Sequence, residues 1–256
     1  MSGSVEGVHE NEFGVLAGWT ADELEGRDGP SILAGACRGS GSPAALAWLA
    51  ESMRLEHGDR LLDIGAGLGG PTAWAIARYG VQAVGIEPMV DACRGARRLF
   101  DHPVLAAAAD ALPVATATFD AAWLLGVLDT VPDATAALTE VRRALTSQGR
   151  VGILAYVATC AVAPDAGPVG NHFQTLPELE ISLLASGLAV LDRVQAIDQF
   201  DAPLDWRLRQ ERLDDALADH HADDRRWIEA QHQERAFADL LRAGTVEPVL
   251  LHALAV

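Results

Sequence analysis

The sequence predicts an α/β fold, in which a doubly wound, mostly parallel sheet of seven strands carries helices on both faces. Short apolar runs with the length of buried strands alternate with stretches of helical periodicity. A glycine-rich turn at residues 65–70 follows the first of these runs and precedes a helical pattern. With 256 residues, half of them hydrophobic, the chain is long enough for one domain, residues 1–256, with a sizeable core.

Seven apolar runs, most of them bounded by turn residues, are expected to form the strands. Their ranges are 60–64, 81–86, 104–108, 119–125, 150–157, 188–197 and 247–256. Helical patterns lie between most of them, at 72–79, at 89–100, from Asp133 to Gly149, and at 175–187, where Thr175 and Glu178 form a capping box. This alternation implies a parallel sheet whose ligand cleft lies at the carboxyl ends of the strands.

Two segments lie outside this alternation. Residues 1–58 are expected to form an N-terminal helical cap segment, in which Ser42 caps a helix that stops near Gly58. Residues 201–243 read as a charged helical insertion before the last strand, with large aromatic side chains that must be buried. The insertion is a candidate lid over the ligand cleft, a substrate wall or a dimer contact, and packing on the outer helices of the sheet alone is the alternative.

The glycine turn fits two classes of ligand. Gly65-x-Gly67-x-x-Gly70 is a dinucleotide fingerprint, in which a pyrophosphate sits on the start of a helix. Asp63 precedes it and gives the different pattern Asp-x-Gly-x-Gly-x-Gly, in which a carboxylate suits a cationic ligand and repels a pyrophosphate. A glycine-rich turn without chemical meaning is the remaining alternative.

Further acidic residues follow the second and third strands. Glu87 ends the second strand, 24 residues after Asp63, near the spacing at which an acid binds ribose hydroxyls in nucleotide folds. Asp110 follows the third strand. The carboxyl ends of parallel strands share one edge of the sheet, so these three carboxylates should lie in one cleft.

Composition excludes several classes of partner. The net charge of −17 argues against nucleic acid and against an anionic membrane surface, because either needs a cationic footprint. All 19 basic residues are Arg, which favours a GC-rich genome, in which secondary metabolism is a plausible setting. Three distant cysteines indicate neither a disulfide framework nor a zinc site, and we expect no metal. No secretion signal is recognised and the apolar run 151–164 is too short to cross a bilayer, so we expect a cytoplasmic protein.

In chain order, several motifs together resemble the class I, Rossmann-like, S-adenosylmethionine (SAM)-dependent methyltransferases of the small-molecule branch. They are Leu-Asp-Ile-Gly-Ala-Gly-Leu-Gly-Gly, Val-Gly-Ile-Glu-Pro, Ala-Asp-Ala-Leu-Pro, Phe-Asp-Ala-Ala-Trp and the helix-to-strand passage 141–152. The motifs carry the resemblance over residues 59–157. The remainder of the chain resembles the family only in the order of its expected strands. It implies that the seventh strand is antiparallel.

The resemblance implies a role for each residue of the cleft. Motif I would lie against the methionine part of SAM, Glu87 would hold the ribose hydroxyls, and Asp110 would accept from the adenine amino group. Gly126, after the fourth strand, would border the reacting methyl group. The implied cofactor set is Asp63, Gly65, Ala66, Gly67, Glu87, Pro88, Met89, Asp110, Ala111, Leu112, Leu125 and Gly126.

The sequence offers two candidates for a catalytic base. Many relatives place a His just before Val-Pro-Asp, where this chain has Thr130. Asp129 is a candidate substitute, although its position favours a solvated turn carboxylate. His172, in a loop after the fifth strand, is the stronger candidate, and a loop His without a task is its alternative. Methyl transfer from a sulfonium needs mainly in-line placement and exclusion of water, so a base matters only for a protonated acceptor.

We therefore expect an enzyme that transfers a methyl group from SAM to a small-molecule acceptor. An NAD-dependent oxidoreductase is the alternative of another chemistry, and a SAM-binding domain that transfers nothing is the non-enzymatic one. We expect no nucleic acid and no membrane as partners. The oligomeric state stays open, with a dimer among the possibilities, as do the acceptor and the atom that is methylated.

Overall fold

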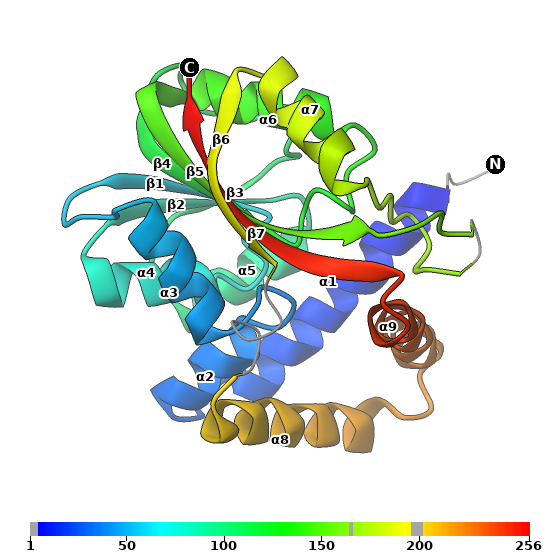
Figure 1. Cartoon of the computed structure of the whole chain (residues 1–256). Helices are drawn as coiled ribbons and strands as arrows, with labels where there is room; N and C mark the ends of the chain where they lie inside the picture. Colours follow the sequence, from blue (N-terminus) through cyan, green and yellow to red (C-terminus); the bar gives the residue numbers. More distant parts are fainter. Residues whose placement is uncertain (1–4, 164–165, 196–201) are drawn as a thin grey trace.

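The computed structural model describes residues 5–163, 166–195 and 202–256 (Figure 1). Within these ranges the strands form one seven-stranded sheet in the order β3-β2-β1-β4-β5-β7-β6. The first five strands pair with one another in parallel, and β7 is antiparallel to both β5 and β6. The strands are β1 (Arg60–Ile64), β2 (Gln82–Glu87), β3 (Val104–Ala106), β4 (Phe119–Leu125), β5 (Leu145–Ala158), β6 (Leu188–Gln195) and β7 (Val246–Ala255). The predicted α/β sheet with an antiparallel last strand is confirmed.

Helices cover both faces of the sheet, as predicted. One apolar cluster packs α6 and α7 against one face, and a second packs α3 and α4 against the other (Figure 1). The helices that follow individual strands are α4 (Gly70–Tyr79), α5 (Val90–Leu99), α6 (Ala134–Ala144) and α7 (Leu176–Ala185). The capping box at Thr175 and Glu178 is formed at the start of α7.

Some predicted boundaries are wrong, and one lies outside the described residues. The helix that begins after Asp133 ends at Ala144, not at Gly149, because Leu145 already pairs with Phe119 of β4 and is buried in the core. The third strand stops at Ala106, two residues early. The end predicted for the sixth strand, Ile197, lies outside the described residues.

The N-terminal segment is helical, and its helices are α1 (Val5–Leu24), α2 (Gly29–Ala36) and α3 (Pro43–Ser52). The Ser42 hydroxyl accepts a hydrogen bond from the Ala45 N–H at 3.2 Å, so α3 begins where the sequence predicts. It ends at Ser52, earlier than the predicted stop near Gly58.

The insertion consists of two helices, α8 (Leu204–His221) and α9 (Arg225–Arg242), and its predicted first residue, Asp201, lies outside the described residues. Both helices contact the N-terminal segment, with α8 against α1 and α2, and α9 against α1 (Figure 1). A Cβ on Gly35 would come within 3.0 Å of the side chains of Leu24 and Leu213, which shows how closely α2 approaches its neighbours. The buried residues of this third cluster are Ala21, Leu24, Ala36, Leu68, Leu213, Leu217 and Trp227.

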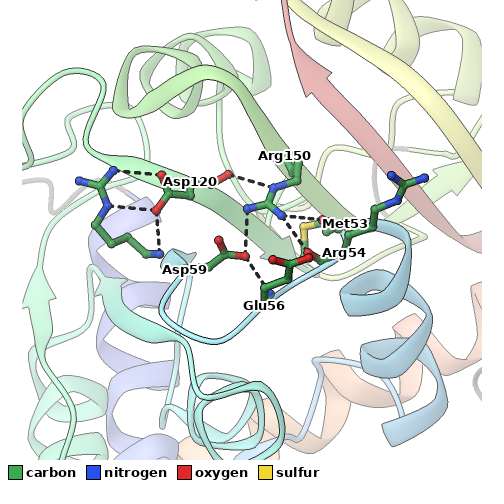
Figure 2. A network of polar contacts seen from close by, with 7 residues as sticks. Met53, Arg54, Glu56, Asp59, Asp120 and Arg150 are labelled. Atoms are coloured by element: carbon green, nitrogen blue, oxygen red, sulfur yellow. Dashed lines mark hydrogen bonds and ion pairs between the residues drawn. The ribbon is translucent and has the colours of Figure 1, made fainter.

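A polar network closes the amino edge of the sheet (Figure 2). The Arg150 guanidinium donates to the carbonyl oxygens of Met53 at 3.1 Å and Arg54 at 2.8 Å, and pairs with Asp59 at 2.9 Å. These contacts join the end of α3 to β5 and to the residue before β1. The network lies at the edge opposite to the carboxyl ends of the parallel strands.

In the described part of the chain, no helix is both long and apolar enough to cross a membrane.

Candidate active site

The glycine turn connects β1 to α4 at the carboxyl edge of the sheet. Gly65, Gly67 and Gly69 have φ angles of 71°, 53° and 78°, in the left-handed region that side chains disfavour. A Cβ on Gly65 would lie 2.3 Å from a methyl carbon of Val127, whereas one on Gly67 would meet nothing within 4 Å. The turn therefore packs tightly against the end of β4 on one side and leaves open space at Gly67, where a ligand can approach the backbone.

Asp63 lies beneath this turn and is 1% exposed. The Thr72 hydroxyl, in the first turn of α4, donates to its carboxylate. Burial, with the nearby charge of Glu87 as a smaller cause, raises the pKa of Asp63 to about 6. Burial raises the pKa of the Cys37 thiol, and the charge of Asp63 raises it further as a smaller cause. Cys37, in the N-terminal segment, therefore lies near Asp63 beneath the glycine turn.

Glu87 ends β2 and is 2% exposed. One carboxylate oxygen accepts the Gly67 N–H and the other accepts the Met89 N–H, both at 2.9 Å. Burial raises the pKa of Glu87, and these two hydrogen bonds oppose that shift. Each oxygen keeps a further lone pair, so the carboxylate can hold the glycine turn and still accept from a ligand hydroxyl. Pro88 is exposed and Met89 is half-buried beside it.

The segment after β3 supplies the third acid. Asp110 and Ala111 are exposed, and β3 pairs with β2 through Ala106 and Glu87, so the segment leaves the sheet beside Glu87. Leu112 points into the core, and its N–H donates to Glu140 at 3.0 Å. Of the predicted residues here, the structure leaves Asp110 and Ala111 accessible to a ligand.

Gly126 follows β4 with a φ angle of 73°, and Leu125 before it is buried. A Cβ on Gly126 would lie 2.9 Å from the Gly39 carbonyl oxygen and 3.6 Å from a ring carbon of Tyr156. The N-terminal segment and β5 thus meet at the residue that the resemblance places beside the reacting methyl group.

Asp129 is 5% exposed, so the expectation of a solvated turn carboxylate is wrong. One of its oxygens accepts the Asn171 amide at 2.8 Å, and its backbone carbonyl accepts the His172 N–H at 2.6 Å. The other oxygen, Oδ1, is buried and has no hydrogen-bond partner among the described residues. Burial raises the pKa of Asp129 to about 6.

The His172 side chain is exposed, although its backbone is tied to Asp129. A small cavity of about 10 Å³ lies between the two residues. Its lining residues are Leu128, Asp129, Ala155, Tyr156, Val157, His172, Gln174 and Leu179.

Three aromatic side chains, of which Tyr156 lines this cavity, were not predicted as site residues. The Tyr156 ring meets the Phe237 ring edge-on, with centroids 4.8 Å apart, and Phe237 stacks on Phe173 at 6.0 Å. They come from β5, from the loop after it and from α9. Their spacing in sequence carries no periodic signal, and only the fold brings them together.

Comparison with known proteins agrees with this geometry. Residues 62–153 match a family described as "Methyltransferase domain". MmaA2 from Mycobacterium tuberculosis, a cyclopropane synthase, superposes with a TM-score of 0.67 at 15% identity over 82% of this chain and 83% of that chain. SpnF, a [4+2]-cyclase, superposes with a TM-score of 0.66 at 24% identity over 82% of this chain and 79% of that chain. A geranyl diphosphate C-methyltransferase from Streptomyces coelicolor A3(2), bound to S-adenosyl-L-homocysteine, superposes with a TM-score of 0.61 at 20% identity. The match covers 83% of this chain and 76% of that chain.

The structural likenesses are all below 25% identity and show the fold, which is that of the class I methyltransferases. The family match over residues 62–153 adds the activity, because the family is described as a methyltransferase domain. The protein is a SAM-dependent methyltransferase, and SAM is its cofactor. This assignment replaces the alternative of an NAD-dependent oxidoreductase.

Proposed function

We propose that the protein transfers the methyl group of SAM to a small-molecule acceptor at the carboxyl edge of the sheet. The observation that carries the proposal is the convergence of two buried carboxylates, Asp63 and Glu87, on a glycine turn with open space at Gly67. A buried carboxylate beneath the turn suits a ligand with sulfonium and ammonium charges. The other residues of the implied cofactor set keep the roles given above as part of the proposal.

The acceptor would lie between Gly126, the aromatic side chains and α9. Helices α8 and α9 then form a cover over the acceptor, with the N-terminal segment as its second wall. For an acceptor that must lose a proton, Asp129 and His172 are the candidate bases. A cytoplasmic setting in secondary metabolism fits the composition and the biosynthetic names of the similar structures.

Two measurements test the proposal. Calorimetric titration should show binding of SAM and S-adenosylhomocysteine and none of NAD. One similar structure bears the name of a cyclase, so binding does not by itself establish transfer. Incubation with labelled SAM and a metabolite extract should then yield S-adenosylhomocysteine and a labelled product. SAM binding without any turnover would favour the domain that binds SAM and transfers nothing.

The pH dependence of SAM binding follows from the pKa of Asp63, which burial raises to about 6. Below that pH the free protein carries a proton on Asp63 and must release it to bind a cationic ligand. The affinity should therefore fall as the pH falls, by up to about tenfold per pH unit between pH 6 and pH 5. Calorimetry at several pH values measures the slope, which should flatten in Asp63→Asn. A flat profile in the wild type would remove Asp63 from contact with the cationic part of SAM.

A further inference from the structure

The carboxylate of Asp129 is buried and only half satisfied. Asn171 binds Oδ2, while Oδ1 has no donor among the described residues. A buried charged oxygen without a hydrogen bond is costly, and the cost is removed when a ligand or a water donates to it. The adjoining cavity of about 10 Å³ has room for about one water-sized group. Asp129 Oδ1 therefore faces a site for a hydrogen-bond donor.

Tyr156, which lines the cavity beside Asp129, suits a cation together with Phe237, which contacts Tyr156, and Phe173, which stacks on Phe237. Tyr156, Phe173 and Phe237 are all half-buried, so part of each ring stays available to a ligand. Burial, and then the charge of Asp129, raise the pKa of the Tyr156 phenol, so the phenol stays neutral and lies within the field of the carboxylate. Aromatic faces attract ammonium groups, most strongly where water is excluded.

The same groups lie beside the expected path of the methyl group. The Tyr156 ring is 3.6 Å from the position of a Cβ on Gly126, and Asp129 follows Gly126 by three residues in the same turn. Of the described residues that line the cavity, His172 alone has a basic side chain. An acceptor that brings a positive charge would thus complete a site that holds an uncompensated carboxylate and three aromatic rings.

We propose that the acceptor is an aliphatic amine with an apolar substituent, bound as its ammonium form between Asp129 Oδ1 and the rings of Tyr156 and Phe237. The proposal rests on the proposed function. Asp129 takes one proton from the ammonium nitrogen, and the freed lone pair attacks the methyl carbon of SAM. The electron pair of the carbon–sulfur bond passes to sulfur, which leaves S-adenosylhomocysteine and an N-methylammonium product. The proton on Asp129 then passes to solvent.

Calorimetry with matched probes tests the acceptor class. Hexylamine, 1-hexanol and hexanoate share one apolar chain and differ in the head group, and each is titrated into the protein saturated with S-adenosylhomocysteine. We expect hexylamine to bind at least tenfold more tightly than the other two. Equal binding of amine and alcohol, or no binding of hexylamine, overturns the amine proposal.

Variants assign the preference to the site. Asp129→Asn should abolish the preference for hexylamine, and Phe237→Leu should reduce it about threefold to tenfold, while both retain wild-type SAM affinity. Asp239→Asn removes the same charge from an exposed position on α9 and should change nothing. Melting temperatures show that each variant is folded. The SAM affinity separates the proposed function from the amine proposal. A wild-type protein that does not bind SAM would defeat the proposed function, whereas SAM binding with an unchanged preference for hexylamine in Asp129→Asn defeats only the amine proposal.

Discussion

Replacing Glu87 with alanine is expected to weaken SAM binding by about 1 to 3 kcal/mol, the range for loss of hydrogen bonds to a charged group. The carboxylate has two tasks in the proposed site. It accepts the N–H groups of Gly67 and Met89, and in our proposal it also holds the ribose hydroxyls of the cofactor. Alanine removes both, and it leaves two backbone donors without their present partner beside the glycine turn. Calorimetric titration with SAM measures the loss as a change of about 5-fold to 150-fold in Kd.

A matched control lies in the next helix along the chain. Asp91 is an exposed acid in the first turn of α5 and pairs with Arg94, so Asp91→Ala removes the same charge four residues away. It should leave the SAM affinity within about twofold of the wild type, because exposed ion pairs contribute little. Wild-type affinity in Glu87→Ala would contradict the assignment of the ribose site.

The geometry of the glycine turn and of Glu87, on the proposed cofactor side, could be predicted from the sequence because its determinants are local. Gly65, Gly67 and Gly69 have positive φ angles, and glycines at alternate positions in the sequence indicate such angles directly. Glu87 could be placed because a strand, a turn and a helix have nearly fixed lengths, so the spacing from Asp63 indicates the same edge of the sheet.

The acceptor side could not be predicted, because it depends on contacts between distant segments. Phe237 reaches Tyr156 only because α9 packs against α1 and the start of β7. Asp129 reads as a solvated turn residue, yet the loop that carries Asn171 folds over it and excludes water. The helix after Asp133 was predicted too long for a similar reason, since the pairing of Leu145 with β4 is not visible in the helical pattern.

Replacing Leu217 with alanine is expected to destabilise the fold by about 2 to 5 kcal/mol, the usual cost of deleting a fully buried leucine side chain. Leu217 lies on α8 and is 0% exposed. Its cluster joins the insertion to the N-terminal helices and includes Leu68 from the glycine turn. Urea denaturation measures the loss of unfolding free energy. Leu208→Ala, on the same helix at a side chain that is 38% exposed, should cost about 0.5 kcal/mol or less.

The apolar cluster around Leu217 also contains Leu68 of the glycine turn, so we expect Leu217→Ala to affect the covering of the ligand site as well as the stability. If α8 and α9 cover the site, Leu217→Ala should loosen the cover as well as the fold. Cleavage by trypsin at the arginines within residues 207–242 should then be faster than in the wild type, and S-adenosylhomocysteine with an acceptor should slow it in both proteins. Leu208→Ala should be cleaved at the wild-type rate. A stability loss in Leu217→Ala with no effect of ligands on cleavage in either protein would make these helices a scaffold for the N-terminal segment, and the cover proposal would fail.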